Sequence, residues 1–552
     1  MSPPEEYDIV VYGSTSGAVA TAIQAARLGR SVSLISPQEH IGGIQVNGLG
    51  ATDIDNQAEF QNSTAVGGLN LEFHRRISAH YGRLDRLNEV VKKRLKVPEV
   101  WRFEARVAER IIREWLDEHR SIAIIRACVV SAERTRRCPK GWQHDQDRPA
   151  GKRSNHCREG RGCLTIISDG LTYGDQIFVE ASYEGDLLAA ASLSWTRGRE
   201  PMATYSESLA GVRAETVFCQ IDVDMDPYMR SGDPSSGLLY GISDEPFGTP
   251  GDGDLHLQSY SYRMPLTDDP ANRVPFTKPE GYDPAHYELH RRFIQAGGEM
   301  YAPKKRIPGE KTDLIGSEGA LSTDLVGMND EWPVASHEQR ARILDDTARF
   351  TKGFFWFLVT DEAVPKCYRE EWSRFGYCRY EFPENGHFPR ELYVRDARRM
   401  ISDYVVTQAA ASEGGAPQVP DPVAVAYWPP DMHSVRRVLR DGRVRNEGFI
   451  FKDRHRWRPF GIAYRALVPR RTEAVNFITP TCPSSSHVGY GAIRLEHQFY
   501  ALGQACANAC DVAIENGYTM QDVPYEFLKD RLLEQGVVLD AAAVGVPSFG
   551  NM

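Results

Sequence analysis

The chain has 552 residues, 41% hydrophobic and 25% charged, which is typical of a globular protein with more than one domain. A net charge of −10 provides no basic surface for nucleic acid. No stretch approaches the roughly 18 apolar residues of a membrane span, and the first residues lack the basic and apolar segments of a secretory signal. We therefore expect a soluble, cytoplasmic protein.

The ten cysteines are scattered along the chain and do not form the pattern of a disulfide framework. Cys506 and Cys510 lie four residues apart among alanines, and we interpret them as small packing residues. Several cysteines and histidines occur in or beside a basic insertion at 134–161, but their spacing fits no standard zinc site. We predict a hairpin loop there and no metal.

The first predicted elements form a βαβ unit. Residues 8–12 and 31–35 are apolar strands, and the helix between them, at 18–28, is rich in small residues. Gly13 begins the turn after the first strand, and Thr15 stands where G-x-G-x-x-G has its second glycine. Such a turn places a dinucleotide pyrophosphate at a helix N-terminus. An ordinary βαβ unit without a nucleotide is the alternative.

The region after the second strand favours FAD over NAD. The strand ends at Ser36, where a dinucleotide site usually has an acidic residue for the ribose. A glycine-rich loop follows at 40–50, where an NAD-binding domain normally continues into a helix. In flavoproteins a Gly-Gly loop at this point passes close to the ribityl chain and the isoalloxazine. An irregular surface loop is the alternative.

Three further strands are predicted at 121–130, 163–168 and 176–180. In flavoproteins a hairpin at this place covers the adenine, here with Val129 near it. A second glycine turn at 181–186 then leads into a short helix. It offers further backbone N–H groups to the cofactor.

The composition changes after about residue 199, where proline, aromatic and charged residues become more frequent. Helices are predicted at 336–350 and 393–408. We interpret residues 201–463 as an inserted substrate domain of mixed α+β structure.

The chain then returns to the nucleotide domain, with a final strand predicted at 476–480 and a long helix at 494–516. The positive end of a helix after the connecting loop would favour reduced flavin, which carries negative charge near N1 and O2. The predicted fold class is α/β, with a discontinuous Rossmann-type FAD-binding domain built from residues 1–200 and 464–552.

Many short motifs, in one order along most of the chain, resemble one family of FAD-dependent oxidoreductases whose members are often labelled loosely as xanthan-lyase-like. The motifs include VYGST at 11–15, HIGG at 40–43, GLGATD at 48–53, ASYEGDL at 181–187, LYVRDAR at 392–398 and SSHV at 485–488. The resemblance implies FAD in a domain of glutathione-reductase-like fold, and members commonly carry Gly-Thr where Thr15 stands. The chain departs from the family at Ser36, Glu391 and His497, where Glu, Gln and Pro are common.

Flavin-dependent oxidation of a C–OH or C–NH bond needs a base for the heteroatom proton. His487 and His433 are the candidate bases, because histidine titrates near neutral pH. The alternatives are a flavin contact or a helix cap for His487 and a structural role for His433. Arg494 is a candidate for the flavin or a substrate carboxylate, and Arg263 and Arg395 are candidate substrate anchors with internal ion pairs as the alternative.

The residues expected to bind FAD lie on the turns and loops described above. They are Gly13, Thr15, Ser16, Gly17, Ser36, Gln38, Gly42, Gly43, Gln45, Gly48, Val129, Ala181, Gly185, Asp186, His487, Gly491 and Arg494.

The leading hypothesis is a dehydrogenase or oxidase that transfers a hydride from a small polar or natural-product substrate to flavin N5, with O₂ among the candidate electron acceptors. A single-component NAD(P)H-dependent monooxygenase and a flavin-binding protein without turnover are the alternatives. The sequence shows no second glycine-rich βαβ unit for NAD(P)H, which disfavours a reductase with two dinucleotide sites.

Overall fold

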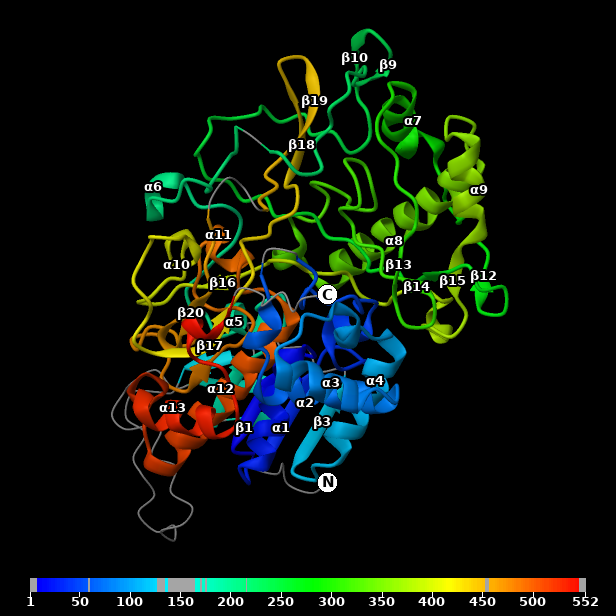
Figure 1. Cartoon of the computed structure of the whole chain (residues 1–552). Coiled ribbons are helices and arrows are strands. Elements are labelled where there is room, and N and C mark those ends of the chain that lie inside the picture. Colours follow the sequence, from blue (N-terminus) through cyan, green and yellow to red (C-terminus); the bar gives the residue numbers. More distant parts are fainter. Residues whose placement is uncertain are drawn as a thin grey trace.

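The computed structural model describes residues 7–57, 60–126, 176–214, 216–451 and 456–545, and the backbone of the strands at 135–137, 164–168 and 171–173. Its main sheet has the strand order β21-β7-β1-β2-β3 and lies in the lower half of Figure 1. These strands are β1 (Ile9–Tyr12), β2 (Val32–Ser36), β3 (Ile122–Arg126), β7 (Ile177–Glu180) and β21 (Phe477–Ile478).

Every pairing in this sheet is parallel. The apolar strands β1, β2 and β7 are buried, as expected for a parallel sheet covered by helices, whereas the edge strand β3 is mostly half-buried. Because β21 comes from the C-terminal part of the chain, the sheet is completed from both sides of the middle region, which we define as residues 201–463. The α/β class and the Rossmann-type domain are confirmed. The three domain boundaries stay predictions.

Two helices with many small residues cross next to this sheet, α1 (Ser16–Arg27) and α12 (Glu496–Asn516). They approach each other at glycines: a Cβ on Gly503 would lie 2.4 Å from the carbonyl oxygen of Gly17. The Thr21 hydroxyl donates to the Gly503 carbonyl at 3.1 Å. This contact joins the first and last parts of the nucleotide domain.

Three helices form the connection between β2 and β3: α2 (Gly68–His80), α3 (Leu84–Lys93) and α4 (Ala105–Asp117). The strand predicted at 163–168 is present as β5 (Leu164–Ser168), which pairs antiparallel with β4 (Thr135–Arg137) and β6 (Leu171–Tyr173). The strands predicted at 121–130 and 176–180 belong instead to the main sheet, as β3 and β7. The predicted contact residue Val129, and the cysteines and histidines of the 134–161 insertion, lie outside the described residues.

The middle region consists of short antiparallel strands and a few helices, drawn mainly from green to yellow in Figure 1. Its helices are α6 (Met202–Tyr205), α7 (Glu288–Gln295), α8 (His337–Thr360), α9 (Lys366–Arg374) and α10 (Gln408–Ala411). Its strands are β9 (Tyr228–Arg230), β10 (Asp233–Leu238), β11 (Leu266–Thr267), β12 (Arg273–Val274), β13 (Lys305–Ile307), β14 (Lys311–Thr312), β15 (Gly376–Cys378), β16 (Arg399–Met400), β17 (Pro422–Ala426), β18 (Arg436–Arg440), β19 (Arg443–Glu447) and β20 (Phe460–Ala463).

The helix predicted at 393–408 is wrong. Most of this segment is irregular, with a short strand, β16, and a helix that begins only at Gln408. Its backbone N–H groups bond to distant segments: that of Tyr393 to the Ser261 carbonyl at 2.9 Å, and that of Met400 to the Cys482 carbonyl at 3.1 Å. These long-range bonds replace the intrahelical ones. The other predicted helix of the middle region is present and longer than expected, as α8.

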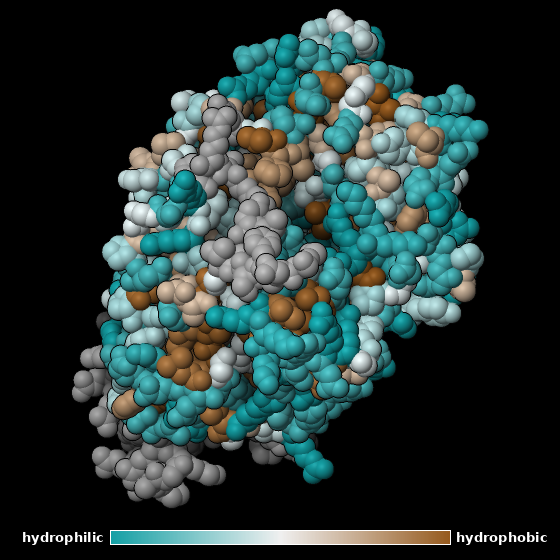
Figure 2. All heavy atoms as spheres, viewed as in Figure 1, coloured by the Kyte–Doolittle hydropathy of each residue, from teal (hydrophilic) through white to brown (hydrophobic). Residues whose placement is uncertain are grey.

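Within the described ranges, no helix combines the length and the apolar character needed to span a bilayer. The face drawn in Figure 2 is mostly hydrophilic, with small separate groups of hydrophobic residues.

Candidate functional site

The turn after β1 packs tightly against the end of β7. Gly13 has a φ of +128°, and a Cβ there would lie 2.2 Å from the carbonyl carbon and oxygen of Ala181. The Thr15 hydroxyl donates to that carbonyl at 2.8 Å and accepts from the Ala18 N–H at 3.3 Å, so it caps α1. Glycine is therefore required at position 13, and the turn is fixed before any ligand binds.

The N-terminus of α1 faces a buried carboxyl group. Its first N–H groups, including those of Ser16 and Gly17, have no intrahelical partner. The Ser16 hydroxyl donates to Glu496 Oε2 at 2.6 Å, and the Tyr183 hydroxyl donates to Glu496 Oε1. Burial raises the pKa of Glu496 to about 7. A substantial fraction of Glu496 is therefore neutral near pH 7, which leaves the helix end suited to an anion.

The Gly-Gly loop lies directly against this turn. The Gly42 N–H donates to the Ser14 carbonyl at 2.7 Å, and a Cβ on Gly43 would lie 2.2 Å from Tyr183 Oη. The buried side-chain oxygens of Gln45 and Asn47, Oε1 and Oδ1, have no hydrogen-bond partner among the described residues. The loop thus presents unsatisfied polar atoms in the interior, where each would cost about 1–3 kcal/mol without a ligand.

Other predicted cofactor residues are engaged within the protein. The Ser36 hydroxyl donates to the Gln38 carbonyl at 2.6 Å and closes the turn after β2. Asp186, at the start of α5 (Asp186–Ala190), accepts two hydrogen bonds of 2.7 Å from Arg340 and one of 2.8 Å from Arg398. Their contacts with FAD stay predictions.

Two other glycines allow close approach near the site. A Cβ on Gly48 would lie 2.0 Å from the Arg263 carbonyl oxygen, and one on Gly491 would lie 2.6 Å from Met432 Sδ. Gly185 has a φ of +68° and precedes α5.

Tyr393 brings together the three arginines singled out in the sequence. The guanidinium carbons of Arg263, Arg395 and Arg494 lie 5.9, 5.0 and 5.8 Å from the centre of its ring. These distances allow cation–π attraction. Arg494 Nη1 also donates to Tyr393 Oη at 3.1 Å, and its Nε donates to the Asp431 carbonyl at 2.8 Å.

Two of these arginines are held by carboxylates. Arg263 forms a bidentate pair with Asp313, with bonds of 2.7 and 2.6 Å. Arg395 Nη1 lies 3.3 Å from Asp324 Oδ1, and its Nη2 donates to Ser261 Oγ at 2.9 Å. These are the internal ion pairs weighed above as the alternative, and a direct role in substrate binding stays a prediction.

A narrow cavity of about 10 Å³ lies between the glycine-rich loop, Tyr393 and the start of α12. Its lining residues are Gln45, Leu49, Thr52, Asp53, His74, Tyr393, Leu495, Glu496 and His497. Burial, reinforced by Asp431, raises the pKa of Asp53 to about 6. Burial also lowers the pKa values of His74 and His497 to about 3, so both imidazoles are neutral at pH 7.

Sequence reasoning missed several residues of this region: Asp53, Tyr393, Asp396 and Glu496. Asp53, Tyr393 and Asp396 lie within motifs used for the family resemblance, and Glu496 lies two residues after Arg494, which are the signals that could have identified them. The motifs alone do not reveal that these side chains meet.

His487 begins the short helix α11 (His487–Gly491), which Ser486 caps by accepting from the Gly489 N–H. Its Nδ1 lies 3.2 Å from Asp396 Oδ2, without the alignment of a hydrogen bond, and both side chains are buried. Its Nε2 has no hydrogen-bond partner in the described ranges. A buried imidazole beside a carboxylate, with one free nitrogen, has the form of a general base.

His433 forms a second buried histidine–carboxylate pair, with Asp324. Its Nδ1 lies 2.7 Å from Asp324 Oδ2, and its ring stacks on Phe449 with centres 5.3 Å apart. Burial, followed by the nearby Arg395, lowers its pKa, so the imidazole is neutral at pH 7.

The residues present fit FAD. The free N–H groups at the start of α1 suit a diphosphate, and the unsatisfied Gln45 and Asn47 side chains suit the polar edge of a flavin. The part of the chain that the structure describes contains no group of three or more His, Cys, Asp or Glu side chains arranged for a metal ion.

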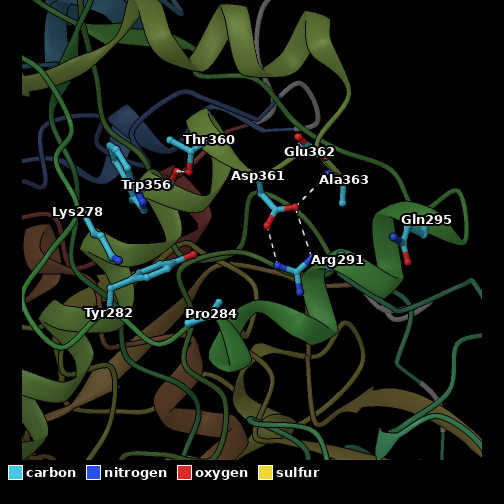
Figure 3. Close-up of a pocket in the computed structure, with 10 residues that line it drawn as sticks. All are labelled: Lys278, Tyr282, Pro284, Arg291, Gln295, Trp356, Thr360, Asp361, Glu362 and Ala363. Carbon is cyan, nitrogen blue, oxygen red and sulfur yellow. Dashed lines mark hydrogen bonds and ion pairs between the residues drawn. The ribbon is translucent and has the colours of Figure 1, made fainter.

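A larger, open pocket lies entirely in the middle region (Figure 3). It encloses about 930 Å³, and its lining residues fall between positions 278 and 363. Figure 3 shows Arg291 and Asp361 pointing toward one another, and Arg291 Nη2 donates to Asp361 Oδ2 at 2.6 Å. Since no residue of the glycine loops lines this pocket, it is not the candidate site.

A sequence model of the family described as FAD dependent oxidoreductase matches residues 8–532. No curated protein matches the chain.

Several solved structures align with part of the chain. L-Proline dehydrogenase from P. horikoshii is 14% identical, over 36% of this chain and 59% of that one, with a TM-score of 0.23. THI4 from Thermovibrio ammonificans is 15% identical, over 35% and 66%, with a TM-score of 0.21. Thioredoxin reductase from T. acidophilum is 11% identical, over 38% and 39%, with a TM-score of 0.18. The chain spans less than two thirds of each, and TM-scores this low do not establish a shared activity.

Proposed function

Since the chain belongs to the FAD dependent oxidoreductase family, it is an FAD-dependent enzyme, and we propose that it oxidises a small polar molecule by hydride transfer. The substrate carries a C–OH or C–NH group. The heteroatom gives up its proton to the protein, and the carbon gives up the hydride.

This proposal depends on the free Nε2 atom of His487 and on the carboxylate beside its Nδ1. Its free Nε2 accepts the heteroatom proton, while the Asp396 carboxylate, 3.2 Å from Nδ1, stabilises the imidazolium that results. FAD, when bound, would supply the two-electron acceptor for this oxidation. The His487 backbone N–H donates to Glu200 Oε2 at 2.8 Å, which fixes the backbone of this residue.

We place the polar group of the substrate beside Arg494 and Tyr393. Arg494 is the proposed anchor, because its hydrogen bonds go to a phenol and a carbonyl and its nearest carboxylate oxygen, on Asp431, lies 3.6 Å away. The buried walls exclude water, which strengthens the attraction between the guanidinium and a polar substrate.

The test is anaerobic reduction of the flavin by a panel of alcohols, amines, hydroxy acids and amino acids. The reduction is measured as the loss of flavin absorbance. With an active substrate, His487→Gln should slow reduction by about 10²–10⁴-fold without releasing FAD. His433→Gln is the matched control, a second buried histidine beside a carboxylate, and should change the rate by less than about 10-fold.

An unchanged rate in His487→Gln would exclude it as the base. Flavin that stays oxidised with the whole panel but is reduced by NADPH, with oxygen uptake, would favour the monooxygenase. Flavin that no donor reduces would favour binding without turnover.

A further inference from the structure

The open pocket in Figure 3 is large enough for a small molecule. Of the space that it encloses, about 540 Å³ is open to a ligand, within the range of roughly 300–1,000 Å³ that small-molecule sites occupy. Residues of α7 and α8 and of the segments next to them form its walls, so the pocket belongs wholly to the middle region. Its ligand would therefore be recognised by residues that take no part in the flavin site.

Trp356 contributes an aromatic ring to this pocket. It lies on α8 between Phe355 and Phe357, which are fully buried, whereas Trp356 is half-buried and lines the pocket. Its indole ring stacks on no other ring of the described residues, and its N–H has no hydrogen-bond partner among them. An exposed indole of this kind can pack on an apolar surface and donate a hydrogen bond at its edge.

Tyr282 forms a second aromatic wall, and its ring is held in place by the core. The ring stacks on that of the buried Tyr287, with centres 5.3 Å apart and planes 10° apart, and Tyr287 stacks in turn on Phe350. Lys278 Nζ lies 5.6 Å from the centre of the Tyr282 ring. Since the tyrosine is already fixed, little conformational entropy is lost when a ligand packs against it.

The charged side chains that line the pocket cancel one another. Arg291 donates to Asp361 at 2.6 Å, and these two charges are satisfied within the protein. Lys278 and Glu362 are exposed, and neither has an ion-pair partner among the described residues. With two positive and two negative charges, the pocket favours neither an anion nor a cation, but its free ammonium and carboxylate can donate to and accept from a neutral ligand.

We propose that this pocket binds a neutral sugar of one or two pyranose rings. A pyranose has C–H groups on its faces and hydroxyls around its edge, so a face packs on Trp356 while hydroxyls bond to Lys278 and Tyr282. Figure 3 shows these three side chains at the same end of the pocket. The Glu362 carboxylate accepts from further hydroxyls. The site is independent of the proposed reaction and stands whichever substrate the flavin oxidises.

The test is calorimetric titration of the holoenzyme with cellobiose, which has two pyranose rings and no charge. Cellobiose should bind in a saturable way without a change in the flavin absorbance, because the pocket lies apart from the flavin site. Glycerol, at the same concentration of hydroxyl groups, should show no saturable binding, because it has no ring face to pack on Trp356. Phenyl phosphate, an aromatic ring with negative charge, should bind more weakly than cellobiose.

Three variants locate the binding. Trp356→Ala should weaken cellobiose binding at least about 10-fold, and Trp356→Phe, which keeps a ring face, by less than about 3-fold. Tyr380→Ala is the control, because this tyrosine is an exposed aromatic residue of the middle region that does not line the pocket. It should bind cellobiose as the wild type does. If Trp356→Ala does not fold, Lys278→Ala, at an exposed position, should weaken binding about 3–10-fold.

Cellobiose that shows no saturable binding, or that binds Trp356→Ala as tightly as the wild type, would overturn the proposal. Phenyl phosphate that binds more tightly than cellobiose would overturn the assignment to a neutral sugar. Since binding is measured without turnover, failure here is separate from failure of the proposed reaction.

Discussion

Two buried carboxyl groups at the nucleotide end and two in the middle region are held in opposite ways. Glu180 and Glu496, near the Gly13 turn, accept hydrogen bonds from N–H and O–H groups and have no ion pair among the described residues. Asp313 and Asp324, in the middle region, lie against arginines. Glu180 and Glu496 thus interact with neutral hydrogen-bond donors, whereas Asp313 and Asp324 interact with positively charged side chains.

This difference determines which acids are charged at pH 7. Burial raises the pKa of Glu180 to about 8 and that of Glu496 to about 7. Burial also acts on Asp324, but Arg395 and His433 outweigh it and hold the pKa of this carboxyl below its ordinary value. Glu180 and Glu496 can thus lose their negative charge next to a diphosphate, whereas Asp324 stays ionised beside Arg395.

The largest expected effect comes from removing the close approach at the nucleotide turn. Gly13→Val should destabilise the protein by more than about 4 kcal/mol, because its side chain would overlap the Ala181 backbone. Gly29→Ala is the control, with a similarly positive φ of +84° but no atom within 4 Å of the added Cβ. It should cost about 1 kcal/mol. If urea unfolding showed that Gly13→Val and Gly29→Ala lose the same unfolding free energy, the packing argument would be refuted.

Breaking one ion pair of the middle region should have the next largest effect. Asp313→Ala leaves the buried Arg263 without its carboxylate and should cost about 3–5 kcal/mol in unfolding free energy. A loss below about 1 kcal/mol would mean that water or another group replaces Asp313.

The pH dependence of the unfolding free energy should show that Glu496 is a carboxyl group with a raised pKa. Its pKa is about 7 in the folded protein and about 4.3 when unfolded, so its protonation stabilises the fold fully below pH 4. This contribution is lost as the pH rises through 7. Relative to Glu496→Gln, the wild type should lose roughly 2–3 kcal/mol between pH 4 and pH 8. Parallel stability curves for the two proteins would contradict the assignment.

The smallest effect is expected at the open pocket in Figure 3. Asp361→Ala removes the partner of Arg291, whose side chain is 26% exposed. Since water can replace the carboxylate there, the cost should be about 0–1 kcal/mol. A cost as large as that of Asp313→Ala would remove the distinction between buried and exposed pairs.

The nucleotide end could be predicted from the sequence because its pattern is local. Strand, turn and helix around Gly13 follow one another within about twenty residues, and the structure has them in that order. The partners of the turn, Tyr183 and Glu496, could not be predicted, because their contacts join segments more than 300 residues apart.

The arginines around Tyr393 also could not be predicted to lie together from the sequence. Arg263, Arg395 and Arg494 were singled out for their chemistry, but Tyr393, around which they meet, was placed in a helix that the structure does not contain. Hydrogen bonds to distant strands decide the conformation of that segment, and helical periodicity carries no information about them.

The most direct test of the account is the affinity of the apoprotein for FAD after a charge is placed in the Gly13 turn. Ser14 is buried there, and its carbonyl accepts from the Gly42 N–H. Ser14→Asp should weaken FAD binding by about 100-fold, through repulsion of the diphosphate, whereas Ser14→Asn should bind FAD almost as the wild type does. A folded Ser14→Asp protein that binds FAD with wild-type affinity would show that the diphosphate lies elsewhere.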